Sequence, residues 1–414
     1  MPRTTTPVSV GGSSRLPSLT GMRFIAAVLV FLHHGIWVNV FSDQDVVSFY
    51  RELFINAGHV GVSFFFILSG FVLTWSARKK DTFGRYLRRR VAKVYPNHVV
   101  TFVAALLLVA TTTKAYQAVP NLLLVQSWFP AYDVLFSVNP PSWSLACEVL
   151  FYLSFPLLLK YVSRIPAARL WWWAGAVVAA VFAAALLAQF VLPSVPAMPD
   201  GQPIGLYQFW FVYAFPPVRA LDFLLGILMA KIVMEGRWIR IGLAPAALLF
   251  VACYALASEL PYVYGLNAAT IVPLALIVPA AAVADSEGRR TLLRGRVAGW
   301  LGEVSYAFYL VHVVVLIWAR AQLGNPQGWS TAAGLGLLLA GLALSLLAAW
   351  ALHAWVEQPA MRRWSKPKAD RAARVPGQGR APAAARSGAE PEHEPENGPK
   401  SESESERVTT AGTV

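Results

Sequence analysis

Long apolar segments alternate with short polar segments over most of the chain. A helix that crosses a bilayer needs about 20 mainly apolar residues, because each residue advances it by about 1.5 Å. The sixth apolar segment begins at Pro216 and Pro217, since proline suits the first turn of a helix, and we assign residues 207–215 to an interfacial or re-entrant piece. The pattern predicts an all-α polytopic membrane protein with about ten transmembrane helices, at roughly residues 19–38, 57–76, 91–112, 142–160, 169–193, 216–232, 241–258, 266–285, 299–319 and 331–356.

The basic residues are concentrated in every second connection between these segments. Cytoplasmic loops of membrane proteins carry an excess of Lys and Arg, so this alternation predicts that both termini are cytoplasmic. The two end segments have a polar, Pro- and Ser-containing composition that cannot bury a core. We therefore predict a flexible cytoplasmic leader (1–17), a transmembrane domain (18–364) and a disordered cytoplasmic tail (365–414).

The composition narrows the class of protein further. Of the 414 residues, 56% are apolar and 14% are charged, with a net charge of +13. A nucleic-acid-binding protein can have such a balance, but here the charges lie in short loops, which is the distribution that orients a membrane protein. Cys147 and Cys253 lie in apolar segments without the spacing of a disulfide framework or metal site. The sequence predicts no nucleic-acid partner and no metal.

The first predicted span carries two ionisable residues on one face. Arg23 and His34 are separated by three helical turns plus about 20°, and lie about 16 Å apart along the axis. His33 lies about 80° from that face and ranks second. Because ionisable residues in spanning helices point into the protein or a wet cavity, this face predicts a site.

Glu148 is the acidic residue of the fourth predicted span. Counting along the helices places Glu148 about 9 Å below the outer edge of the hydrocarbon core and His34 about 22 Å above the inner edge, at similar depth. A carboxylate orients an imidazole and stabilises its protonated form, so we predict His34 as a general base and Glu148 as its partner. A structural His–Glu pair that joins two helices explains these residues equally well.

Near the predicted cytoplasmic side, Arg23 and the segment 85–93 form a cationic cluster. Guanidinium groups bind phosphate oxygens in a bidentate manner, so the cluster predicts an entrance for a phosphate-rich donor. For the segment alone, fixing the topology or contacting anionic lipid is the simpler interpretation.

The other polar positions in the spans have structural interpretations. The run 61–71 ends in Ser-Gly, and small residues predict a notch where helices pack closely. Arg219 and Asp222 are three residues apart and predict a neutralising pair, with substrate binding as the alternative. We interpret His312 as a packing residue and expect Glu357 to pair with a nearby arginine.

Together these motifs resemble the acyltransferase-3 family, integral membrane enzymes that move acyl groups onto hydroxyls of sugars, glycans and natural products. The resemblance covers residues 17–363. Its motifs are the Arg-x10-His of the first span (Arg23, His34), GVSFFFILSGF (Phe65, Ser69, Gly70), RRRVAKVYP, WSLACEVLFYLSFP (Trp143, Ser144, Glu148, Tyr152), RALDFLLG (Arg219, Phe223, Gly226), LGEVSYAFYLVH (Gly302, Ser305, Tyr306, His312) and WVEQP (Glu357, Pro359).

The resemblance implies an acyl-CoA co-substrate with no bound cofactor, an essential His34 and an Arg23 near the CoA phosphates. Two departures are visible: Lys93 stands where the family often has arginine, and Cys147 precedes a single acidic residue where the family often has two. The opening LPSLTGMRFIAA is similar to actinobacterial members that acylate macrolides. On these motifs we assign catalysis to His34 and Glu148, donor binding to Arg23, Ser69, Arg90 and Lys93, and substrate binding to Trp143, Tyr152 and Arg219.

The sequence therefore predicts a multi-pass plasma-membrane O-acyltransferase that transfers an acetyl or short acyl group from acyl-CoA to a sugar, glycan or macrolide hydroxyl. The main alternative is a proton-coupled transporter or exporter, in which His34, Glu148 and Arg219 form a proton relay. A non-catalytic scaffold that recruits partners through its tail is a third hypothesis. Acyl length, acceptor, side of transfer, a covalent acyl-enzyme and oligomeric state stay open.

Overall fold

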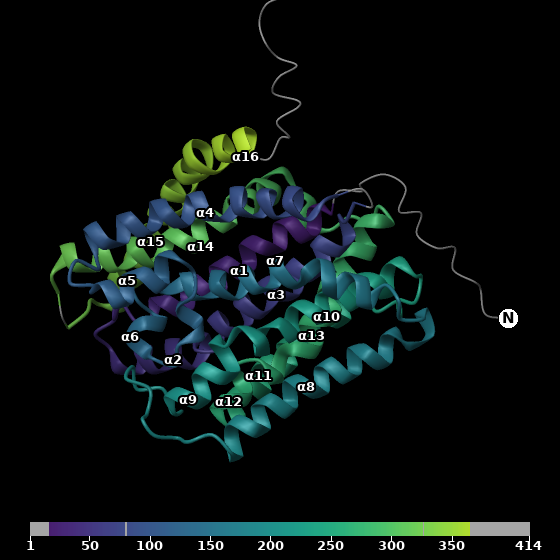
Figure 1. Ribbon diagram of the computed structural model, residues 1–414. Coiled ribbons are helices and arrows are strands. Elements are labelled where there is room, and N and C mark those ends of the chain that lie inside the picture. The colour runs from purple at the N-terminus through teal and green to yellow at the C-terminus, as the bar shows by residue number, and fades with distance from the viewer. Residues whose placement is uncertain (1–15, 79–80, 326, 365–414) are drawn as a thin grey trace, which may run out of the picture. The chain divides into compact units, whose positions relative to one another are not determined.

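The computed structural model of the protein describes residues 16–78, 81–325 and 327–364 (Figure 1). Nearly all of the predicted leader and the whole predicted tail lie outside these ranges. Within them the chain is helical, and extended backbone pairs only in isolated bridges. The helices are α1 (Pro17–Gly35), α2 (Gln44–Phe54), α3 (Ala57–Trp75), α4 (Phe83–Leu108), α5 (Ala115–Leu122), η1 (Gln126–Trp128), α6 (Tyr132–Leu135), η2 (Pro140–Ser142), α7 (Trp143–Val162), η3 (Ala167–Arg169), α8 (Leu170–Phe190), α9 (Leu206–Phe209), η4 (Trp210–Ala214), α10 (Pro216–Met234), α11 (Leu243–Glu259), α12 (Tyr262–Gly265), α13 (Ala268–Ser286), η5 (Leu292–Arg294), α14 (Arg296–Leu323), α15 (Thr331–Leu352), η6 (His353–Glu357) and α16 (Gln358–Trp364).

Each of the ten predicted spans coincides with one long helix, and α10 begins at Pro216 as predicted. By length and composition, eight stretches of the described chain could cross a membrane. The two helices outside that set are α10, which carries Arg219, Asp222 and Lys231, and α11, which has 17 residues. The all-α polytopic architecture is confirmed, with eight candidate spans by this criterion instead of ten. The cytoplasmic placement of both termini stays a prediction.

The cationic segment 85–93 lies on a helix and not in a loop as predicted, because α4 begins at Phe83. The Thr82 side chain accepts a hydrogen bond from the Arg85 amide and caps the helix. Arginine and lysine are good helix formers, so the helix extends beyond the apolar segment. Hydropathy located the apolar part of this helix and missed its first two turns.

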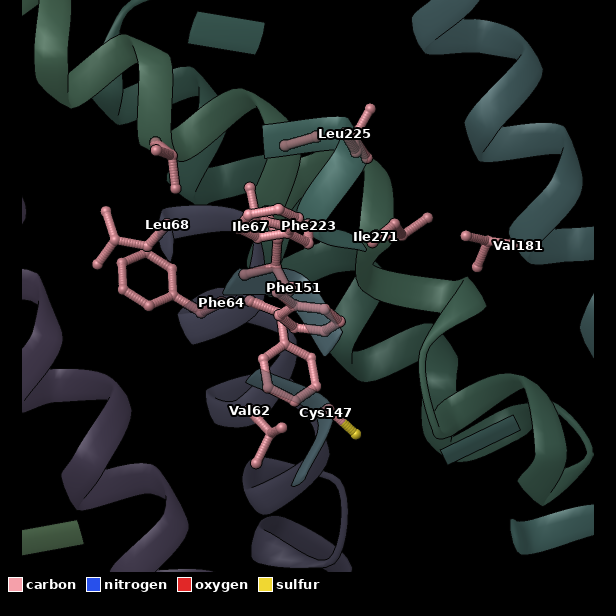
Figure 2. Packing of buried hydrophobic residues seen from close by; sticks show 14 of the residues in the cluster. Val62, Phe64, Ile67, Leu68, Cys147, Phe151, Val181, Phe223, Leu225 and Ile271 are labelled. Atoms are coloured by element: carbon pink, nitrogen blue, oxygen red, sulfur yellow. The ribbon is translucent and has the colours of Figure 1, made fainter. Parts of the chain in front are cut away.

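Two glycines form the close crossing of α3 and α10. A Cβ added to Gly70 would lie 2.0 Å from the Phe223 carbonyl oxygen, and one added to Gly226 would lie 2.0 Å from that of Ile67. The two backbones therefore touch, which confirms the predicted packing notch. Next to the crossing, the rings of Phe223 and Phe151 stack with centroids 4.8 Å apart (Figure 2).

A fully buried ion pair lies on the same helix, and the predicted pairing of Arg219 with Asp222 is confirmed. The Arg219 Nη2 is 2.6 Å from the Asp222 Oδ2. The same Nη2 donates to the Ser63 Oγ of α3 at 2.7 Å, and the Asn267 Nδ2 donates to the Asp222 Oδ1 at 2.9 Å. The pair thus joins α10 to α3 and to the residue that precedes α13.

Replacing Gly226 with Ala should destabilise the fold, because its new methyl group meets backbone that cannot move aside. We expect a loss of about 1–3 kcal/mol, and a lower thermal midpoint for the purified protein in detergent. Gly175 on α8 is the control, since an added Cβ there meets nothing within 4 Å. Equal midpoints for G226A and G175A would contradict the close crossing.

Candidate functional site

Three cavities adjoin one another between the helices. The entrance cavity, of about 370 Å³, has charged lining residues Arg78, Asp81, Arg89, Arg90 and Lys160. The basic cavity, of about 350 Å³, has charged lining residues Arg23, Arg90, Lys93, Glu148 and Glu303. The histidine cavity, of about 310 Å³, contains His33, His34 and His59. The first two share Leu73 and Arg90, and the last two share Val62 and Tyr309.

The basic cavity brings together the four residues predicted to bind a donor. Arg23 comes from α1, Ser69 from α3, and Arg90 and Lys93 from α4, and all four line its wall. The Arg23 guanidinium has no hydrogen bond or ion pair to another part of the described chain. Glu148 and Tyr152 of the same cavity interact with it electrostatically, but its N–H groups stay available, so it is suited to bind an anion.

Glu148 also lines the basic cavity, and the predicted pairing of Glu148 with His34 is wrong. The Glu148 Oε2 accepts a hydrogen bond from the Tyr152 hydroxyl at 2.7 Å. The depth count assumed that α7 begins at the membrane surface. Instead Asn139 and Ser142, which come just before the helix, are fully buried. The helix starts inside the protein, so Glu148 lies nearer to Arg23.

His34 is held by α14. Its Nδ1 lies 2.8 Å from the Val30 carbonyl oxygen and 3.2 Å from the His312 Nε2. The His312 Nδ1 lies 3.1 Å from the Phe308 carbonyl oxygen. A carbonyl can only accept, so the Nδ1 of each histidine carries the proton, and the His34 Nδ1–H points at two acceptors. The His34 Nε2 then keeps its lone pair and has no partner within the described residues.

The sequence interpretation missed His312 as a residue of this site. It is fully buried on α14, in ring contact with Phe31 as well as His34, with centroids 6.2 and 5.0 Å apart. A histidine inside a long apolar helix was the available signal, and packing was chosen over function. The error arose because a contact between residues 278 positions apart leaves no trace in a local pattern.

Besides His33 and His34, the wall of the histidine cavity contains one residue that the sequence predicted for substrate binding and two polar residues that the prediction missed. Trp143, predicted to contact substrate, lines it together with His59 and Asp200. The His33 ring lies between those of His34 and His59, with centroids 5.3 Å from each. His59 lies in the first turn of α3, and nothing in the local sequence distinguishes it from an ordinary polar residue near a helix end.

The structure places Arg219 away from the three cavities, and its assignment to substrate binding stays a prediction. Arg219 lines none of the three cavities, because Asp222 neutralises it and the rings of Phe66 and Tyr213 cover its guanidinium at 5.2 and 5.7 Å. Tyr152, another predicted substrate contact, lines the basic cavity, where its hydroxyl donates a hydrogen bond to Glu148.

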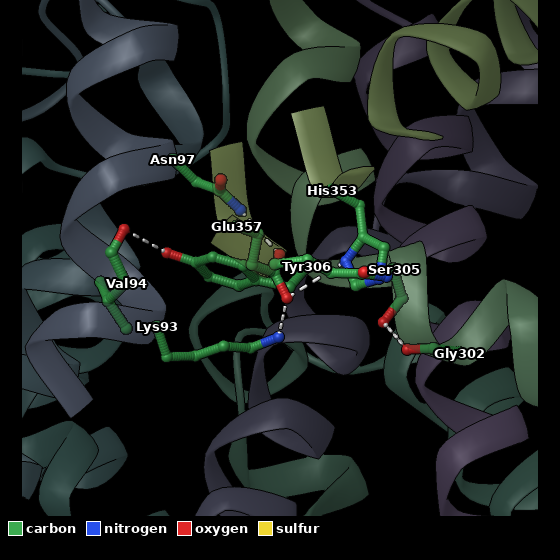
Figure 3. Close-up of polar contacts among 9 residues, drawn as sticks. Lys93, Val94, Asn97, Gly302, Ser305, Tyr306, His353 and Glu357 are labelled. Carbon is green, nitrogen blue, oxygen red and sulfur yellow. Dashed lines mark hydrogen bonds and ion pairs between the residues drawn. The ribbon is translucent and has the colours of Figure 1, made fainter. Parts of the chain in front are cut away.

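Glu357 fastens the last helical segment to α4 beside the basic cavity (Figure 3). Its carboxylate pairs with Lys93, accepts from the Asn97 Nδ2 at 2.8 Å, and lies 3.2 Å from the His353 Nδ1. The prediction of an arginine partner is wrong, since the partner is a lysine. The Lys93 ammonium also lies 5.5 Å from the Tyr306 ring, so part of its charge is already compensated.

No group of three or more His, Cys, Asp or Glu residues in the part of the chain that the structure describes is arranged to hold a metal ion.

Comparison with known proteins gives a consistent set of relatives. Residues 16–354 match the model of a family described as an acyltransferase domain. "Acyltransferase MdmB" of Streptomyces mycarofaciens is 43% identical over 361 residues, which are 84% of this chain and 92% of that protein. "Putative peptidoglycan O-acetyltransferase YrhL" of Bacillus subtilis is 26% identical over 83% of this chain and 54% of its own length. "Peptidoglycan O-acetyltransferase OatA" of Listeria monocytogenes is 24% identical over 76% of this chain and 52% of its own length.

The chain therefore spans most of the first relative and about half the length of the two peptidoglycan enzymes. No solved structure matches it.

Replacing Glu357 with Gln should weaken the attachment of the last segment, since the charge of Lys93 loses its partner and a buried acceptor is lost. We expect a loss of about 1–3 kcal/mol in the free energy of unfolding, measured by denaturant titration in micelles. Glu303→Gln is the control, because Glu303 is exposed and should change stability by less than about 0.5 kcal/mol. Equal effects of E357Q and E303Q would argue against this attachment.

Proposed function

The chain belongs to the acyltransferase family whose model matches residues 16–354, and from that premise we propose a membrane O-acyltransferase that uses acyl-CoA. It transfers an acetyl or short acyl group to a hydroxyl of a sugar, glycan or macrolide-type natural product. The observation that carries the proposal is the row of three cavities, which is cationic at one end and contains histidines at the other. The basic cavity adjoins the histidine cavity at Val62 and Tyr309.

The donor occupies the entrance and basic cavities. Four cations line the entrance cavity against one carboxylate, and Arg23 lines the adjoining basic cavity without a hydrogen bond to the described residues. These groups suit the phosphates of CoA, because arginine binds phosphate oxygens in bidentate geometry. The chain of the thioester then extends toward Val62 and Tyr309, where the basic cavity adjoins the histidine cavity.

In the proposed reaction His34 is the general base. Its Nε2 takes the proton of the acceptor hydroxyl as the oxygen attacks the thioester carbonyl. The tetrahedral intermediate then collapses, the carbon–sulfur bond breaks, and the thiolate of CoA takes the proton from the His34 imidazolium. His312 and the Val30 carbonyl hold the His34 Nδ1–H, which keeps the reactive nitrogen turned to the acceptor.

The acceptor lies in the histidine cavity. Two relatives are named for O-acetylation of peptidoglycan, which supports a hydroxyl on a glycan, while the opening LPSLTGMRFIAA resembles enzymes that acylate macrolides. On the predicted topology this cavity faces away from the cytoplasm, so the two substrates enter from opposite sides of the plasma membrane.

The alternative of a proton-coupled transporter loses its main support. Its relay needed His34, Glu148 and Arg219 in contact, whereas Glu148 bonds to Tyr152, Arg219 pairs with Asp222, and His34 contacts His312.

Purified protein should release free CoA from acetyl-CoA or a longer acyl-CoA when a sugar or macrolide acceptor is present. His34→Ala and His34→Gln should both lower the rate by about 10²–10⁴, since neither side chain takes up a proton. Arg23→Ala should raise the KM for acyl-CoA, with Arg164→Ala, at an exposed position, as the matched control. Release that survives in both His34 variants of unchanged thermal midpoint would overturn the base, and no release with any donor would overturn the enzyme.

His312→Ala should lower kcat by roughly ten- to a hundredfold and leave the KM for acyl-CoA unchanged, because His34 loses an acceptor for its Nδ1–H. His312→Gln offers an amide oxygen at that place and should restore part of the activity. Equal losses in both variants, or a parallel rise in the KM for acyl-CoA, would show that His312 serves packing alone.

A further inference from the structure

The histidine cavity differs from the other two cavities in charge. Among the residues that line it, Asp200 is the only Asp, Glu, Lys or Arg. The basic and entrance cavities each have three or more lining cations. Seven of the other lining residues are Phe, Tyr or Trp, namely Trp37, Tyr132, Phe136, Trp143, Phe209, Tyr213 and Tyr309.

Asp200 is held in place by neutral groups. It lies in the connection between α8 and α9, and its two carboxylate oxygens accept from the Gln202 backbone amide at 3.4 Å and the Gln202 Nε2 at 2.8 Å. Tyr262 in turn donates to the Gln202 Oε1 at 2.7 Å. Within the described residues Asp200 forms no ion pair. Arg51 acts on it electrostatically without a direct contact, and the Arg51 guanidinium stacks over the Trp37 ring at 5.5 Å.

The surroundings of the Asp200 carboxylate favour the binding of a cation beside it. Burial raises the pKa of the Asp200 carboxyl, and the hydrogen bonds from Gln202 and the charge of Arg51 oppose that rise. A half-buried carboxylate of this kind gains most from a positively charged partner that enters the cavity. Aromatic faces next to it attract a cation as well, through their negative π-faces.

His59 supplies a second unpaired polar group in the same wall. Its side chain is 2% exposed, and its Nδ1 has no hydrogen-bond partner among the described residues. A buried polar atom without a partner costs stability unless a ligand satisfies it. A hydroxyl group of an acceptor would satisfy His59.

We propose that the histidine cavity binds an acceptor sugar that carries a protonated amine, with Asp200 as the partner of the ammonium group and His59 as the partner of a hydroxyl. This inference rests on the proposed function, because it names the acceptor class of that site. The cavity of about 310 Å³ lies at the small end of ligand sites, which suits one sugar ring with the rest of the acceptor outside. The opposite charges of the cavities keep the anionic donor and the cationic acceptor apart.

The test uses methyl glucosaminide, which has a free amine, and its N-acetyl derivative, which has none. Binding is measured without donor, on the full-length protein in detergent, from the rise of the thermal midpoint with sugar concentration. For the unaltered protein the apparent Kd of the amine sugar should be about tenfold lower than that of the N-acetyl sugar. Asp200→Asn should abolish this difference and Asp200→Glu should keep most of it.

Asp133→Asn is the matched control, because Asp133 is exposed on α6, accepts hydrogen bonds from Tyr116 and Gln117, and does not line the cavity. It should leave the preference for the amine unchanged. Equal binding of the two sugars by the unaltered protein, no binding of either, or a preference that survives in D200N would each overturn the proposal. Because no donor is present, these outcomes are independent of CoA release, whose absence would overturn the proposed function alone.

Discussion

The bilayer interior offers no hydrogen bonds, so polar groups inside these helices depend on one another. Arg219 and Asp222 meet part of this constraint with an ion pair, extended by hydrogen bonds to α3 and to the residue before α13, while the Arg219 Nε and Nη1 have no hydrogen-bond partner. Lys93 and Glu357 meet it at the wall of the basic cavity, where they connect η6 to α4. Both pairs lie beside the row of cavities, and they hold the helices around it in fixed positions.

Polar groups inside the protein that keep unused hydrogen-bonding or charge capacity mark places where a ligand can bind. Four such groups of the described chain line a cavity. The Arg23 guanidinium and the His34 Nε2 form no hydrogen bond there, the His59 Nδ1 has no hydrogen-bond partner, and the Asp200 carboxylate accepts from Gln202 but forms no ion pair. Arg23 is on the donor side, and the other three are on the acceptor side. A substrate of the proposed reaction satisfies these groups in turn, so their cost in the unliganded protein becomes binding energy.

The sequence was sufficient for the features that depend on local pattern. Apolar segments of sufficient length located the spans, and Pro216 marked the start of α10. The motif residues Arg23, Ser69, Arg90 and Lys93 were correctly expected to lie together. Span length follows from the periodicity of the chain, whereas the grouping of these four residues, which lie on three helices, came from the resemblance to a known family.

The wrong or missed predictions of the site all concern contacts between residues that are far apart in the sequence. Glu148 was placed beside His34 because α7 was assumed to start at a membrane surface, whereas its buried entry shifts Glu148 to the donor side. His312 reaches His34 from 278 residues away, and no spacing in one helix reports such a contact. Asp200 lies in a connection between spans, where the sequence gives no sign that its carboxylate lines a cavity.

Separation of charge along the cavities has a consequence for the proposed reaction. Cations gather in the two cavities that we propose for the donor, and the proposed acceptor cavity has a lone carboxylate, so on this proposal neither substrate is held well at the other's position. The cavities adjoin at Val62 and Tyr309, which carry no charge. A neutral acyl group meets no electrostatic barrier there, whereas the phosphates of CoA lose their partners if they go further. The geometry thus favours passage of the acyl group alone, with His34 on the far side to activate the hydroxyl that receives it.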